Sequence, residues 1–148
     1  HRYSSAASDV YKRQVYKSEL TTTALSSIKV VPFIDDISEA YKWADFVICR
    51  SGALTISELT HVGICSILIP FPHATDDHQF ENAKILERIG AAEIVLHNQF
   101  TPEFMAEKIS FYASNIEARN SMSVKGKLIA EINSTERVSD ECLGVAHG

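Results

Sequence analysis

Long apolar runs and clusters of basic residues are both missing from this sequence. The longest apolar run covers only residues 64–71, whereas a helix that crosses a bilayer needs about 20 apolar residues. No basic run extends beyond Lys12-Arg13, and the formal net charge is −5. The sequence therefore predicts no membrane-spanning segment, no nucleic-acid partner and no polybasic membrane tether.

Cysteines are also scarce. The three cysteines lie at positions 49, 65 and 142, with no Cys-x-x-Cys pair and no zinc-like spacing. Cys49 and Cys65 stand within apolar runs, where we expect them to be small core residues. A sparse, odd number of cysteines fits a reducing compartment, and the sequence favours the cytosol.

The remaining composition is that of a globular domain. The chain has 148 residues, of which 45% are hydrophobic and 22% charged, enough for one domain with a real core. Residues 1–14 contain no initiator Met and no clear periodicity, and we predict that they are a non-native leader. Residues 15–148 are then expected to form a partial domain.

Strand and helix patterns alternate after that leader. Apolar runs predict strands at residues 29–33, 46–49, 65–70 and 92–96. Helices are predicted at residues 35–44, 53–62 and 77–89, and from Pro102 through most of the remaining chain. Residues placed to cap or end these helices are Asp35 or Asp36, Gly63, Gly90 and Thr101.

This order predicts an α/β fold, a Rossmann-like parallel sheet with helices on both faces. Ligands of such sheets bind at the carboxyl ends of the strands. The loops expected there are residues 33–36, 50–55 and 71–79, which are also the loops of unusual composition.

The segment Arg50-Ser-Gly-Ala-Leu-Thr55 follows a predicted buried strand and opens a helix. Gly52 permits a tight turn and a close approach of a ligand to the backbone. The N–H groups and dipole of a helix start attract anions, and Ser51 and Thr55 can add hydroxyl donors. A diphosphate would fit this turn, although a plain strand-to-helix turn explains the same residues.

Glu58 lies one turn into that helix. Its carboxylate can accept two hydroxyl hydrogen bonds, as the diol of a ribose would require. The stretch Thr55-Ile-Ser-Glu58 also has the form of a capping box. By itself, the local sequence favours the cap.

The other two loops carry further candidates. A nucleobase could stack on Phe33 and pair with the backbone of Ile34, or both residues could be core. Gln79 and Asn82 are three residues apart and present amides that suit sugar hydroxyls. His73 and the run Asp76-Asp77-His78 invite a metal, but adjacent side chains at a helix start diverge, so we predict no metal site and no cofactor. No nucleophile motif is present.

Taken together, these segments resemble the MurG family of GT-B glycosyltransferases, which add N-acetylglucosamine to lipid I to form lipid II in peptidoglycan synthesis. The resemblance rests on VPFIDDI at 31–37, ADFVICRSGALTISEL at 44–59, IPFPHATDDHQ at 69–79, NA at 82–83 and GAA at 90–92. It extends from about residue 15 to the end. It implies that the chain is the UDP-sugar-binding carboxyl-terminal domain, incomplete at its start.

The resemblance also implies roles for individual residues. Ile34 would meet the uracil through its backbone, with Phe33 nearby, and Glu58 would bind the ribose. Gln79 would bind the N-acetylglucosamine hydroxyls, with His78 beside it in an open role. The diphosphate would lie at the turn, flanked by Arg50, and the substrate-binding set there is Ser51, Gly52, Ala53, Leu54, Thr55, Ile56 and Ser57.

The remaining implications concern the parts that this chain is expected to lack. The acceptor site for lipid I, the membrane-contact patch and the general base would lie in a missing amino-terminal domain, so no catalytic residue is assigned here. The whole enzyme would be peripheral on the cytoplasmic face of the bacterial inner membrane. Three alternatives remain open: a GT-B enzyme with another donor or acceptor, a non-catalytic nucleotide-sugar-binding module, and a sugar-nucleotide epimerase.

Overall fold

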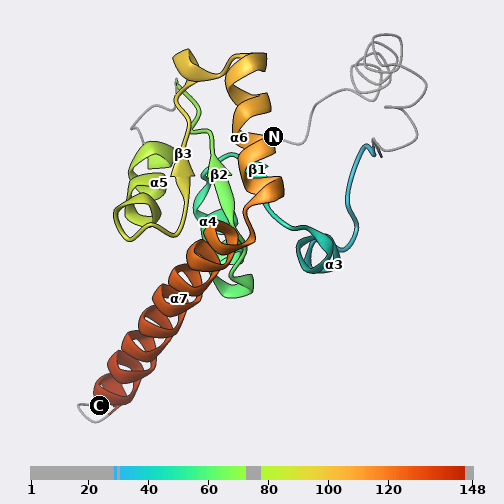
Figure 1. Cartoon of the computed structure of the whole chain (residues 1–148). Coiled ribbons are helices and arrows are strands. Elements are labelled where there is room, and N and C mark those ends of the chain that lie inside the picture. The colour runs from blue at the N-terminus through green and yellow to red at the C-terminus, as the bar shows by residue number, and fades with distance from the viewer. Residues whose placement is uncertain (1–28, 30, 73–77, 146–148) are drawn as a thin grey trace. The chain divides into compact units, whose positions relative to one another are not determined.

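A computed structural model describes residue 29, residues 31–72 and residues 78–145 of the chain (Figure 1). The chain divides into a unit that ends at Ile37 and a unit that runs from Ser38 to the end. The predicted leader, residues 1–14, lies outside the described residues.

Three parallel strands form the sheet of the second unit. They are β1 (Val47–Cys49), β2 (Ser66–Leu68) and β3 (Glu93–Ile94), in the spatial order β1-β2-β3. The helices that connect them are α4 (Ala53–Val62) and α5 (His78–Arg88). This arrangement confirms the prediction of a Rossmann-like parallel sheet.

The other helices precede and follow the sheet. Helix α3 (Ile37–Trp43) comes before β1, and the short 3-10 helix η1 (His97–Gln99) follows β3. Helices α6 (Pro102–Ser114) and α7 (Ile116–Val145) complete the described chain. Among the described residues, no helix has the length and apolarity to cross a membrane.

Apolar side chains pack on both faces of the sheet because neighbouring residues of a strand point in opposite directions. Leu68 packs with helices α3, α4 and α5 in a cluster that includes Tyr41, Leu59, Ala83 and Leu86. Ile67 and Ile69 pack on the other face with α6, in a cluster that includes Cys65, Val95, Met105 and Tyr112. Helices therefore cover both faces, as predicted, and Cys65 is a fully buried core residue as expected.

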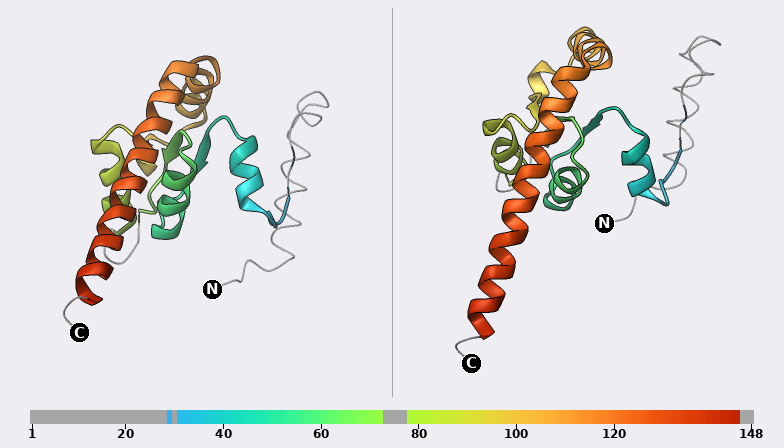
Figure 2. Two further views of the ribbon diagram at one scale, coloured as in Figure 1. Left: turned by 90° about the horizontal axis from the view of Figure 1, so that it is seen from below. Right: turned by 60° about the horizontal axis from the view of Figure 1, so that its bottom comes forward.

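Helix α7 packs against the apolar clusters on both faces of the sheet. Met122 packs on the α6 side and Ile129 packs on the α4 side. Figures 1 and 2 show α7 running alongside α4 and then extending beyond the sheet.

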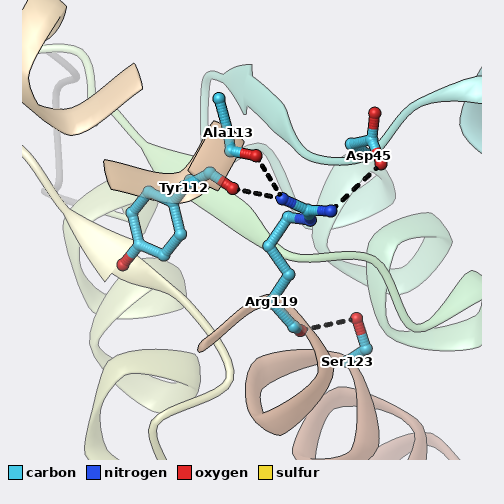
Figure 3. A network of polar contacts seen from close by, with 5 residues as sticks. All are labelled: Asp45, Tyr112, Ala113, Arg119 and Ser123. Atoms are coloured by element: carbon cyan, nitrogen blue, oxygen red, sulfur yellow. Dashed lines mark hydrogen bonds and ion pairs between the residues drawn. The ribbon is translucent and has the colours of Figure 1, made fainter. Parts of the chain in front are cut away.

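Arg119 fixes the start of α7 against two other elements (Figure 3). Its guanidinium donates to the carbonyl oxygens of Tyr112 and Ala113 at the end of α6, at 2.5 and 2.9 Å. It also pairs with Asp45, which precedes β1, at 3.3 Å. Because the last carbonyls of a helix have no partner within the helix, a cation placed there stabilises the helix end.

The predicted helix ends are confirmed where local chemistry sets them. Gly63 follows α4 with a φ of 66°, in the left-handed region that glycine adopts easily. Thr101 caps α6 by accepting a hydrogen bond from the Phe104 N–H at 3.2 Å, and Pro102 is the first helical residue.

The prediction of a strand at residues 29–33 is wrong for the described positions of that range. Residue 29 and residues 31–33 do not form a strand, and Phe33 is 68% exposed. An apolar run becomes a strand only when its backbone pairs with a neighbouring strand, and no such pairing involves the described residues of this range. The predicted strands 46–49, 65–70 and 92–96 do form, but with shorter paired segments.

Candidate functional site

The candidate site lies at the carboxyl edge of the sheet. There the turn after β1 opens α4, and the chain after β2 leads through Pro70 and Phe71 to α5. Because β1 and β2 are parallel neighbours, the two helix starts are brought to the same edge. The structure thus brings Ser51, in the turn before α4, into contact with Gln79 in the first turn of α5.

The start of α4 is open. Its N-cap is Gly52, in an extended conformation with φ −63° and ψ 149°, and no side-chain hydrogen bond caps it within the described structure. The first turn contains no acidic residue. The N–H groups of a helix start have no partner within the helix, so this turn can present donors and a positive dipole end to an anion.

The capping-box interpretation of Thr55 and Glu58 is wrong. Thr55 is the third residue of α4 rather than the residue before it, because the helix already begins at Ala53. A capping box requires the Ser or Thr at the N-cap position, which Gly52 occupies here. Glu58 therefore does not take part in a capping box, the role that the local sequence favoured.

A ring of hydrogen bonds joins the two helix starts. Ser51 is fully buried, and its Oγ donates to the carbonyl oxygen of Gln79 at 2.7 Å. Asn82 Nδ2 donates to the carbonyl oxygen of Ser51 at 3.2 Å. Gln79 Oε1 accepts from the backbone N–H of Phe71 at 3.0 Å. We refer to Ser51, Gln79 and Asn82 as the bracket, and it fixes the α4 turn relative to the first turn of α5.

The bracket changes the roles expected from the sequence. The hydroxyl proton of Ser51 is donated to the Gln79 carbonyl, so this side chain positions the turn. The amides of Gln79 and Asn82 do lie near each other on α5, but each already bonds the protein through one atom.

Arg50 braces the loop after β2. Its Nη1 donates to the carbonyl oxygens of Ile69 and Pro70 at 2.9 and 3.1 Å. Its guanidinium carbon lies 5.4 Å from the centre of the Phe71 ring, within the range of a cation–π contact. From the family resemblance, Arg50 was expected to flank the diphosphate turn. In the structure its guanidinium holds the loop that leads to Gln79.

Glu58 has a partner that the sequence analysis did not identify. The hydroxyl of Tyr41 on α3 donates to Glu58 Oε2 at 3.2 Å. Burial, and after it the hydrogen bond to Glu58, raise the pKa of Tyr41 to about 12. A carboxylate thus lies one turn inside the open helix start with one oxygen held by a neutral donor.

The remaining predicted residues differ in how exposed they are. Phe33 and Ile34 belong to the unit that ends at Ile37, where they are 68% and 44% exposed, and their contact with a nucleobase stays a prediction. His78 is exposed at the start of α5. Ala53, Leu54 and Ser57 are exposed on α4, and Leu54 is 74% exposed, while Ile56 packs against the core.

A hollow of about 360 Å³ adjoins the turn at the same edge of the sheet. It is lined by Ile48, Cys49, Arg50, Ile69, His97 and Phe100. No motif in the sequence points to His97 or Phe100, because nothing local distinguishes a loop residue after an edge strand. Burial raises the pKa of the Cys49 thiol to about 11, so this thiol is protonated at neutral pH.

No group of three metal-binding side chains occurs within residues 29, 31–72 and 78–132. Most of the run that invited a metal, from His73 to Asp77, lies outside the described residues.

Comparisons with known proteins place the chain in one family. Residues 4–137 match the Glycosyltransferase family 28 C-terminal domain. A UDP-N-acetylglucosamine--N-acetylmuramyl-(pentapeptide) pyrophosphoryl-undecaprenol N-acetylglucosamine transferase of Shewanella frigidimarina is 45% identical over 120 residues, covering 81% of this chain and 33% of that protein. The protein of the same name in Marinobacter nauticus is 47% identical over 119 residues, covering 80% of this chain and 33% of the relative.

A solved structure is similar as well. The crystal structure of Acinetobacter baumannii MurG superposes with a TM-score of 0.63 and 42% sequence identity, covering 68% of this chain and 29% of that chain. The chain belongs to the glycosyltransferase family 28 C-terminal domain family. It spans about a third of the length of the curated relatives that it matches.

Proposed function

We propose that this chain forms the donor-sugar site of a MurG-type N-acetylglucosaminyltransferase, which transfers N-acetylglucosamine from UDP-N-acetylglucosamine to lipid I and forms lipid II in peptidoglycan synthesis. The names of the curated relatives support the reaction. The observation that carries the proposal for this chain is the open start of α4, with Gly52 at the turn and Glu58 one helical turn further on.

In this proposal the diphosphate of UDP lies against the backbone from Ser51 to Thr55. Negative charge builds up on the diphosphate as it leaves the anomeric carbon. N–H groups that already point at that charge, together with the helix dipole, stabilise the transition state without reorganising. This gives the open turn a chemical role and requires no metal ion.

The remaining parts of the donor are assigned from the family resemblance of these segments. Glu58 accepts from the ribose hydroxyls, and Gln79 meets the hydroxyls of the sugar. Ile34, with Phe33 beside it, meets the uracil. The bracket keeps the diphosphate turn and the sugar-binding residue at a fixed separation, because it joins α4 to α5 by hydrogen bonds.

The transfer itself inverts the anomeric centre. The C4 hydroxyl of the muramyl sugar attacks and UDP leaves. We assign no residue of this chain to the base that accepts the hydroxyl proton. Lipid I binding and peripheral association with the cytoplasmic face of the inner membrane belong, in this proposal, to the part of the enzyme outside this chain.

Calorimetric titration of the purified chain tests the donor site. We expect UDP-N-acetylglucosamine to bind more tightly than UDP-glucose, and Glu58→Ala to weaken binding by at least about tenfold, since a hydrogen bond to a charged group contributes about 1.5–3 kcal/mol. Glu107→Ala, which removes an exposed carboxylate on α6, is the matched control. A chain that is folded by circular dichroism and binds neither sugar nucleotide contradicts the proposal.

A further inference from the structure

We propose that Tyr41 is a positioning residue of the donor site, whose hydroxyl orients the Glu58 carboxylate to receive the ribose hydroxyls of the nucleotide. This inference rests on the proposed function, because it concerns how the same site recognises the ribose.

The first support is the geometry of the contact. The Tyr41 hydroxyl on α3 donates to Glu58 Oε2 on α4, across 17 positions of sequence, at 3.2 Å. The Tyr41 side chain is only 9% exposed and packs in the same cluster as Leu59 and Ile64. The ring is therefore held by the core, and a fixed ring fixes the direction of its hydroxyl.

The second support is the chemistry of the donor. Burial and the bond to Glu58 raise the pKa of Tyr41 to about 12, so its hydroxyl keeps its proton throughout the neutral range. A phenol is a neutral donor, so unlike a lysine it leaves the charge of Glu58 uncompensated. Among the described residues no hydrogen bond engages Glu58 Oε1, and this oxygen can accept from a ligand hydroxyl.

The third support is the position of Glu58. It lies on the helix that begins at Gly52, so the carboxylate and the open turn share one rigid element. A flexible glutamate loses rotamer freedom when it binds, which weakens affinity. A carboxylate that is already held by Tyr41 loses less, and we expect tighter binding of ligands that carry the diol.

The alternative is that the Tyr41–Glu58 hydrogen bond only holds α3 against α4 and has no part in ligand binding. The structure offers a matched hydrogen bond of that kind, because the hydroxyl of Tyr112 on α6 donates to Glu93 Oε2 at 2.6 Å. Glu93 is also paired with Lys108. Both tyrosines are buried and both donate to a glutamate, but the bond of Tyr112 lies outside the proposed site.

The test compares UDP with 2′,3′-dideoxy-UDP by calorimetric titration of the full chain. We expect the unmodified chain to prefer UDP. Tyr41→Phe should weaken UDP binding by about 3- to 10-fold, the effect of one net hydrogen bond, and leave the affinity for 2′,3′-dideoxy-UDP unchanged. Tyr112→Phe should change neither affinity.

A double-mutant cycle gives an independent measurement. Glu58→Gln should remove most of the preference for UDP, and adding Tyr41→Phe to it should cause no further loss. Thermal melts of each variant check that the chain is folded.

The outcomes separate the inference from the proposed function. If the unmodified chain prefers UDP but Tyr41→Phe weakens both nucleotides equally, or neither, the inference is overturned and the donor site stands. A further loss in the double variant overturns it as well. If the folded, unmodified chain does not bind UDP, the proposed function falls and the inference with it.

Discussion

Two buried serines allow the bracket to be tested with one chemical change. Ser51 Oγ donates to the Gln79 carbonyl at 2.7 Å, and the residue is fully buried. Ser66, in the centre strand β2, is 1% exposed, and within the described part of the chain its Oγ has no hydrogen-bond partner. Replacing each serine with alanine removes one hydroxyl from a buried position.

The two substitutions should differ in sign. Ser51→Ala loses a made hydrogen bond, which contributes about 1 kcal/mol, and leaves the Gln79 carbonyl with one partner fewer. We expect the free energy of unfolding to fall by about 1–2 kcal/mol. Ser66→Ala removes a hydroxyl that was desolvated without compensation, so we expect no change or a gain of up to about 1 kcal/mol.

Urea denaturation followed by far-UV circular dichroism measures both values. Fluorescence is less suitable because Trp43 is 88% exposed and reports little on the core. The expected difference of at least about 1 kcal/mol corresponds to about 2–4 °C in the melting temperature of a domain of this size. Equal losses for the two variants, or a larger loss for Ser66→Ala, would refute the reasoning.

Three further predictions concern two glycines and the buried thiols. Among the described residues, a Cβ added at Gly52 meets only Thr55 Oγ1, at 3.8 Å. Gly52→Ala should therefore preserve the melting temperature and weaken UDP-N-acetylglucosamine binding in a titration. Unchanged binding would contradict a ligand at this turn. Gly63 has φ +66°, and its added Cβ would collide with the Lys127 side chain. Gly63→Ala should therefore lower the free energy of unfolding, measured by urea denaturation, by about 1–2 kcal/mol. An unchanged free energy of unfolding would contradict the left-handed cap. Burial raises the pKa values of Cys49 and Cys65 from 9.0 to about 11. Because these folded-state values exceed the unfolded ones, the stability they contribute is present below pH 9 and is lost as the pH rises toward 11. Urea midpoints measured from pH 8 to 11 check this, and replacing both cysteines with alanine should flatten the decline.

The sequence predicted elements best where the signals were local. The bounds of α4 agree with the prediction at both ends, because Gly52 and Gly63 flank an uninterrupted helical pattern. The cap at Thr101 was predicted for the same reason, since its partner is only three residues away.

Strand lengths were predicted less well because they depend on partners. β3 is paired over only Glu93–Ile94, although the apolar run continues to residue 96. The strand predicted at residues 29–33 is absent from its described positions for the same reason, because these residues pair with no neighbouring strand among the described residues. Hydrophobic pattern reports burial, whereas the ends of a strand are set by the ladder that a neighbour provides.

The sequence by itself determined the alternation of elements, the turn at Gly52 and the place of Glu58 one turn into α4, because helix and turn signals act over a few residues. The resemblance that these segments carry was enough to find the family. Only the tertiary structure decided what the polar groups do. The partners of Ser51 are 28 and 31 positions away, and the partner of Glu58 is 17 positions away on another helix. Contacts over such separations arise from packing the helices on the sheet, and no local pattern encodes them.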